Sequence, residues 1–155
     1  MSFIVSGLPV EPFRPLFGLS EPELAARGIV RRVADARPGF PCRVTLEDAA
    51  PGESVLLLNH EHQSAPTPYR SSHAIYVREA ARETRTLTDE LPEVFLGRTL
   101  SVRAFDAAGM MIDAELCRGD DAAPTFERML REPAAAYLHV HNAGRGCYSA
   151  RVERG

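Results

Sequence analysis

Lysine and tryptophan are both absent from this 155-residue chain, in which all 18 basic residues are arginine. A chain without lysine cannot form a Schiff base with a carbonyl substrate or with pyridoxal phosphate. It also cannot supply the lysine of a phosphate-binding P-loop. We therefore exclude pyridoxal-phosphate enzymes and P-loop nucleotide-binding proteins.

Long apolar runs and cysteine pairs are also missing. No apolar run approaches the roughly 18–20 residues needed to span a bilayer, and the first residues lack the basic region and cleavage site of a signal peptide. The three cysteines are widely spaced and form no Cys-x-x-Cys pair, which argues against a disulfide framework, a zinc ribbon and a thioredoxin-type redox motif. We expect free thiols in a cytoplasmic protein that does not bind membranes.

Charge of one sign is not concentrated anywhere in the chain. The formal net charge is −3, and the arginines form no run longer than Arg31-Arg32. A nucleic-acid-binding domain is normally basic, with clustered cations, so we expect no nucleic-acid partner. Arginine is joined by 21 alanines, and because both residues have GC-rich codons, the composition favours a GC-rich bacterial genome.

The length predicts a single domain over residues 1–155. Short strands occur in runs and helices are few, which indicates an α+β fold with a mainly antiparallel sheet. Ser20-Glu-Pro-Glu23 is a capping box that begins a helix, and Val55-Leu-Leu-Leu58 is typical of a central strand. The remaining expected helices are Asp89–Leu96 and Pro124–Glu132. The expected strands are Phe3–Val5, Ile29–Ala36, Ser54–His60, Ser72–Glu79, Leu100–Phe105, Met110–Leu116, Tyr137–Asn142 and Cys147–Glu153.

Four of the five histidines form two His-x-His pairs, His60 with His62 and His139 with His141. Residues i and i+2 of a strand share one face and lie about 6.6–6.8 Å apart along the backbone. Two imidazoles at that spacing can bind one metal ion, with nitrogen–metal distances of roughly 2.0–2.1 Å. If the two strands are neighbours, the pairs form a four-nitrogen site for a divalent transition metal such as Zn, Cu, Fe or Ni.

A simpler interpretation of the histidines stays open. His139 and His141 share a strand face with Tyr137, opposite Leu138 and Val140. Alternation alone would make them the solvated side of an amphipathic strand, and His62 could already lie in a loop. The chain would then be a non-catalytic interaction domain, for which a homodimer is one arrangement.

Cys147 offers an alternative function. It follows Asn142-Ala-Gly-Arg-Gly146, close in sequence to His139 and His141. A cysteine beside an imidazole and an arginine can act as a nucleophile, although a free cysteine is more often a small buried apolar residue. Arg70 and Arg145 lie in Pro- and Gly-rich loops, where each could bind the carboxylate or phosphate of a small ligand or pair with an acidic side chain instead.

Several separated motifs occur in a characteristic order: Pro41-Cys-Arg43, Leu46-Glu-Asp-Ala-x-Pro-Gly-Glu53, Val55-Leu-Leu-Leu-Asn59, Tyr69-Arg70, Ser72-His-Ala-Ile75 and Tyr137-x-His-x-His-Asn142 followed by Gly146-Cys147. With these motifs the chain resembles, over essentially its whole length, the bacterial domain of unknown function 1203 family. The resemblance implies a small single-domain protein. It implies no activity, cofactor or catalytic residue.

Overall fold

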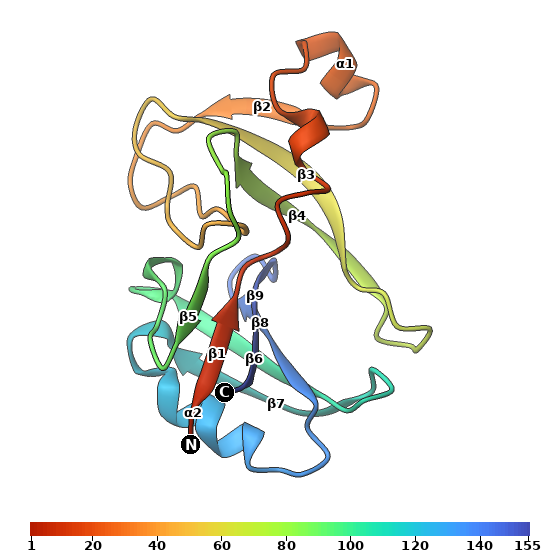
Figure 1. The fold of residues 1–155 in the computed structure, drawn as a ribbon, viewed down its shortest axis with the longest axis vertical. Coiled ribbons are helices and arrows are strands. Elements are labelled where there is room, and N and C mark those ends of the chain that lie inside the picture. The colour runs from red at the N-terminus through yellow and green to blue at the C-terminus, as the bar shows by residue number, and fades with distance from the viewer.

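The computed structural model describes all 155 residues as two antiparallel β-sheets with a few short helices, which confirms the α+β class (Figure 1). The six-stranded sheet has the order β5-β1-β9-β8-β6-β7, and the three-stranded sheet has the order β2-β3-β4. The strands are β1 (Phe3–Ser6), β2 (Val30–Val33), β3 (Ser54–Gln63), β4 (Ser71–Arg78), β5 (Thr86–Thr88), β6 (Thr99–Phe105), β7 (Met111–Arg118), β8 (Tyr137–Asn142) and β9 (Tyr148–Arg154). The helices are α1 (Glu21–Ala25) and α2 (Ala123–Leu130), and three 3-10 turns cover Arg14–Leu16, Glu93–Phe95 and Gly119–Asp121.

The six-stranded sheet packs one face against α2 (Figure 1). Phe126, Met129 and Leu130 recur at helical spacing, and all three are buried in the largest apolar cluster. Leu138 and Val140 of β8 point into the same cluster. This packing leaves the alternate residues of β8 on the opposite face of the sheet.

The three-stranded sheet has its own apolar cluster, built around Leu56 and Leu58 of β3. β3 is the central strand, as the Val55–Leu58 run predicts. Helix α1 lies at the edge of this unit and has the predicted capping box, in which Ser20 Oγ accepts from the Glu23 amide and Glu23 Oε2 accepts from the Ser20 amide. The two apolar clusters are separate, so the contact between the sheets depends on other side chains.

The prediction of a helix over Asp89–Leu96 is wrong, because only a 3-10 turn over Glu93–Phe95 forms there. Asp89 does not cap a helix, because its carboxylate accepts a hydrogen bond of 2.8 Å from the Phe3 amide of β1. The preceding residues Thr86–Thr88 form strand β5, which pairs with β1. A contact distant in sequence thus overrides a local capping pattern. No helix in the structure is both long enough and apolar enough to cross a membrane.

Candidate functional site

Strand β8 presents His139 and His141 on the face of the six-stranded sheet that α2 does not cover. In register with the neighbouring strand β6, His139 lies opposite Arg103 and His141 opposite Ser101. Both histidines are nevertheless almost completely buried, with 3% and 1% of their surface exposed. They are buried because the three-stranded sheet lies over this face.

The covering residue is His62 of β3. This strand continues to Gln63 and therefore extends beyond its predicted end at His60, so His62 is part of the strand and not of a loop. Ring nitrogens of His62, His139 and His141 lie within 4.8 Å of one another. The structure thus brings three of the four predicted histidines together from two different sheets, and we refer to these three residues as the histidine cluster.

Tyr148 holds the histidine cluster in place. Its ring stacks on His62, with centroids 5.4 Å apart and planes 7° from parallel, and it meets His139 and His141 edge-on. A β-bulge between β8 and β9 shifts the register so that Tyr148 lies opposite His141. The bulge therefore places an aromatic ring against all three imidazoles.

The hydrogen bonding of the histidine cluster is incomplete. His141 Nδ1 donates to the Gly146 carbonyl oxygen at 2.8 Å, which leaves Nε2 with a free lone pair. His62 Nδ1 and His139 Nδ1 are buried and have no hydrogen-bond partner. Buried ring nitrogens without partners are rare in folded proteins, and a bound ion or an ordered water is one explanation for them.

Burial keeps these imidazoles neutral. It is the main cause that lowers the pKa of His139 and His141 from 6.5 to about 3, and that of His62 to about 4. The nearby guanidinium of Arg103 lowers all three pKa values further. At neutral pH each ring has a free lone pair, as a metal ligand requires.

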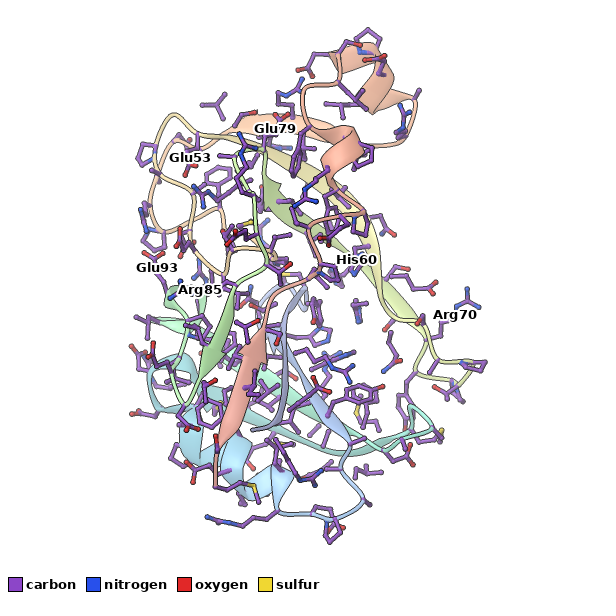
Figure 2. The ribbon with its side chains drawn as sticks, viewed as in Figure 1. Glu53, His60, Arg70, Glu79, Arg85 and Glu93 are labelled. Carbon is purple, nitrogen blue, oxygen red and sulfur yellow. The ribbon has the colours of Figure 1, made fainter.

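His60 lies outside the histidine cluster. Its ring packs near Phe13, with centroids 6.0 Å apart, and it lies opposite His73 in the pairing of β3 with β4. Figure 2 shows His60 near the middle of the molecule. The fifth histidine, His73, is likewise outside the cluster. The structure thus shows a three-nitrogen group and not the four-nitrogen group expected from the sequence.

Cys147 is hydrogen-bonded to Arg43 and Asn142, and not to an imidazole. Its Sγ accepts from Arg43 Nη2 at 3.0 Å and from Asn142 Nδ2 at 3.5 Å. Arg43 is only 2% exposed and also donates to the carbonyl oxygens of Pro41 and Tyr148. The group that would activate Cys147 in the alternative function is therefore a buried guanidinium, where the sequence suggested a histidine.

The two candidate arginines have different surroundings. Arg70 pairs with Glu61 at 3.2 Å and points away from the protein at the β3–β4 turn (Figure 2). Arg145 forms no ion pair or hydrogen bond with the rest of the chain, and it lines a cavity together with Cys147. Among the exposed apolar residues are Ile112 and Leu116 on the edge strand β7, and a homodimer through this strand stays a prediction.

Sequence reasoning missed three residues that shape this region, namely Arg43, Tyr148 and Arg103. Arg43 lies between two apolar residues that belong to the core, Cys42 and Val44. An alternating pattern of apolar residues predicts that Arg43, which lies between them, is exposed, so the pattern does not reveal its burial. Tyr148 could have been found only by anticipating the bulge, and Arg103 only by pairing β6 with β8.

Comparison with known proteins identifies the family. The family model described as "Protein of unknown function (DUF1203)" matches residues 39–154, about three quarters of the chain. The chain therefore belongs to this family, as its motifs predict. The matched region contains the histidine cluster, Arg43 and Cys147. No curated protein and no solved structure matches the chain.

Proposed function

We propose that this member of the DUF1203 family binds one divalent transition metal ion, with zinc as the best fit, through His62, His139 and His141. The observation that carries the proposal is the convergence of three neutral imidazoles, two of them with an unpartnered buried nitrogen. Zinc accepts three protein nitrogens together with a fourth, open position, an arrangement typical of catalytic and not of structural sites.

The geometry is near that of an occupied site. In tetrahedral zinc coordination, ligand nitrogens lie about 3.3 Å apart, whereas the three nitrogens here lie within 4.8 Å of one another. Side-chain rotations that move each ring nitrogen by about 1 Å would bring the three nitrogens to this spacing. His141 would bind through Nε2, because the Gly146 carbonyl occupies Nδ1 and fixes the tautomer.

Charge around the site favours an anion at the fourth position. The histidine cluster contains no carboxylate or thiolate, so the ion would keep its full double charge. Arg103 adds a further cation, because the only hydrogen bond of its side chain goes to Ser101 and it has no acidic partner. Hydroxide or a carboxylate on the metal would offset this excess charge.

We place this function in the cytoplasm of a bacterium with a GC-rich genome. The arginine- and alanine-rich composition supports such a source. All three cysteines are free thiols, which suits a reducing compartment.

The direct test is elemental analysis of untagged protein purified without chelator, followed by calorimetric zinc titration of the same protein after chelator treatment. We expect one zinc per chain, and loss of binding in the double variant His139→Gln/His141→Gln. The double variant His60→Gln/His73→Gln replaces the two histidines outside the histidine cluster and should bind zinc normally. His139 and His141 are buried, so replacing both can weaken the fold. The His62→Gln variant is a second test that is less damaging, because His62 is only half-buried.

Two results would refute the proposal. The first is a wild-type chain that takes up no zinc, copper, nickel or iron. The second is zinc uptake that is undiminished in a folded His62→Gln or His139→Gln/His141→Gln variant. Cobalt substitution adds a spectroscopic check, since a three-nitrogen site with one open position gives the intense visible bands of four-coordinate Co²⁺.

A further inference from the structure

A second site lies between the two sheets, apart from the histidine cluster. It is a cavity of about 720 Å³ at the edge of β4, open to solvent on one side and bordered by Gly39, Phe40, Pro41 and Arg43 and by the β8–β9 turn. Its volume falls within the range of roughly 300–1,000 Å³ that is usual for small-molecule sites. None of the three clustered histidines lines it.

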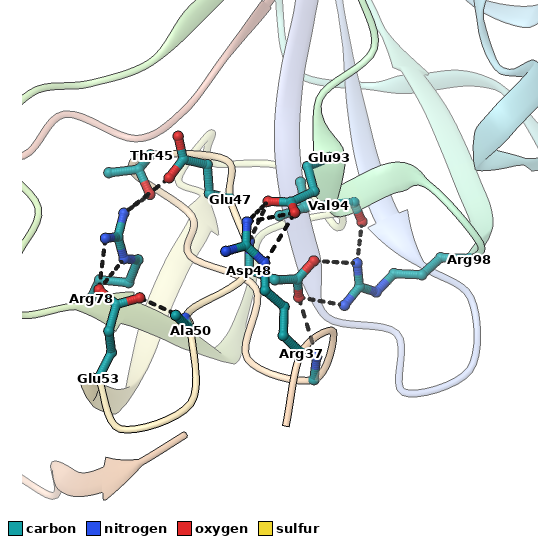
Figure 3. A network of polar contacts seen from close by, with 11 residues as sticks. Arg37, Thr45, Glu47, Asp48, Ala50, Glu53, Arg78, Glu93, Val94 and Arg98 are labelled. Carbon is teal, nitrogen blue, oxygen red and sulfur yellow. Dashed lines mark hydrogen bonds and ion pairs between the residues drawn. The ribbon is translucent and has the colours of Figure 1, made fainter. Parts of the chain in front are cut away.

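The charged groups that line this cavity are all basic. Arg43, Arg98 and Arg145 contribute guanidinium groups, and no aspartate or glutamate is among the lining residues. Arg98 is neutralised by Asp48, with an Nη2–Oδ1 distance of 2.8 Å, in the ionic network shown in Figure 3. Arg43 and Arg145 have no such partner.

Arg43 is a buried cation without a carboxylate partner. Its three hydrogen-bond acceptors are two carbonyl oxygens and the Cys147 sulfur. A guanidinium is charged at any ordinary pH, and an uncompensated charge in a protein interior is costly. An anion in the adjoining cavity would offset this cost, because attraction across a low-dielectric wall is strong.

Arg145 has the free donors that such an anion needs. It is exposed in the β8–β9 turn, and none of its five N–H groups is used within the protein. A guanidinium fork binds carboxylate or phosphate with two parallel hydrogen bonds. The cavity thus combines the fixed, buried charge of Arg43 with the exposed guanidinium of Arg145, which can adjust its position to the anion.

The opposite side of the cavity is apolar and partly aromatic. Leu57 and Tyr76 lie directly opposite each other in the pairing of β3 with β4. The ring of Phe40 packs on Tyr76, with centroids 5.2 Å apart. All three side chains are partly exposed and line the cavity, so they offer a surface for a flat apolar group.

We infer that this cavity binds a small molecule that joins a flat apolar part to a carboxylate or phosphate group. The anionic end contacts Arg145 near Arg43, and the flat part packs against Phe40, Leu57 and Tyr76. This inference does not depend on the metal site.

The test uses benzoate and phenyl phosphate as probes, with neutral benzamide and benzyl alcohol as their matched controls. We expect calorimetry to detect binding of at least one anion and of neither neutral compound. Arg145→Gln should weaken binding about tenfold or more, because it removes charge-assisted hydrogen bonds. Arg70→Gln replaces another exposed arginine that does not line the cavity, and this variant should bind the anions like the wild type.

Cys147 reports where the probe binds, since it lines the cavity. Mass spectrometry should show that the bound anion slows alkylation of Cys147 by iodoacetamide, while the matched neutral compound does not. Alkylation that stays unchanged under saturating anion would place the ligand elsewhere and overturn the inference. So would equal binding of anions and neutral compounds, equal effects of Arg145→Gln and Arg70→Gln, or no binding at millimolar concentrations.

A bound metal could also attract these anions, so the titrations are repeated on chelator-treated protein. Binding that persists without metal supports the cavity. Binding that disappears with the metal assigns the anion to the histidine cluster and overturns the inference, while leaving the proposed function intact.

Discussion

Mild acid should destabilise the metal-free protein, because the fold keeps His139 and His141 neutral. Their pKa values fall from 6.5 to about 3 on folding, mainly through burial. Between these two values the unfolded chain binds more protons than the folded chain, so stability falls as the pH drops below 6.5.

The expected loss in the free energy of unfolding depends only on the pKa of histidine in the unfolded chain, provided that both rings stay neutral in the fold at pH 5. One pKa unit corresponds to about 1.4 kcal/mol, and pH 5 lies about 1.5 units below the pKa of an unfolded histidine. Each ring therefore costs about 2 kcal/mol between pH 7 and pH 5, and the two together about 4 kcal/mol. That is a large share of a typical folding free energy of roughly 5–15 kcal/mol.

Carboxylates contribute little in this interval. Hydrogen bonding to Arg31 is the main cause that lowers the pKa of Glu79 from 4.5 to about 2. The stability that Glu79 provides is therefore lost mostly below pH 4.5. The change in stability between pH 7 and pH 5 therefore comes mainly from the histidines.

The assay is urea denaturation at pH 7 and pH 5 in the presence of a chelator, comparing the free energy of unfolding within each variant. We expect His139→Gln and His141→Gln each to reduce the pH difference by about 2 kcal/mol and the double variant by about 4 kcal/mol. The difference that remains comes from the half-buried His62, whose pKa falls to about 4. Arg70→Gln, an exposed control, should keep the full difference. A wild-type difference below about 0.5 kcal/mol would mean that the rings protonate within the fold. The premise of neutral ligands would then be wrong.

Three further predictions concern the fold and are checked by urea denaturation at pH 7. Ser20→Ala removes the acceptor that caps α1 and should cost about 1 kcal/mol; an unchanged midpoint would show that the cap is not used in solution. Phe126→Ala empties the centre of the larger core and should cost about 3–5 kcal/mol; a loss below about 1 kcal/mol would contradict this packing. Gly119→Ala places a Cβ against the Phe95 carbonyl oxygen and should cost about 1–3 kcal/mol or more. The control Gly144→Ala adds a Cβ that meets nothing within 4 Å and should leave stability unchanged. Equal stability of these two variants would contradict the close approach at Gly119.

Local patterns predict most of the elements of this fold. The capping box at Ser20, the apolar run at Val55–Leu58 and the helical spacing around Phe126 each depend on neighbours in sequence, and each element forms where expected. The prediction at Asp89 fails because its partner is the Phe3 amide, 86 residues away. Residue order alone does not reveal such a contact.

The histidine cluster shows the same limit in a different form. The alternation of β8 predicts that His139 and His141 share a face opposite Leu138 and Val140, and the structure has this arrangement. From the sequence, that face could equally have been in contact with solvent. The covering sheet makes it buried, and no pattern within β8 shows that His62 of β3 lies above it.

The position of both candidate sites between the sheets has an energetic consequence. The two apolar clusters are separate, and side chains such as His141, Tyr148 and Arg43 fill the space between them. An ion held by His62 from one sheet and by His139 and His141 from the other would link the two sheets directly. A ligand that binds only the folded chain stabilises it by about 2.7 kcal/mol at one hundred times its dissociation constant. Zinc should therefore raise the midpoint of unfolding, and it should protect the amides of β3 and β8 from hydrogen exchange more than those of the distant edge strand β7. Equal protection of all three strands would mean that the ion does not join the sheets.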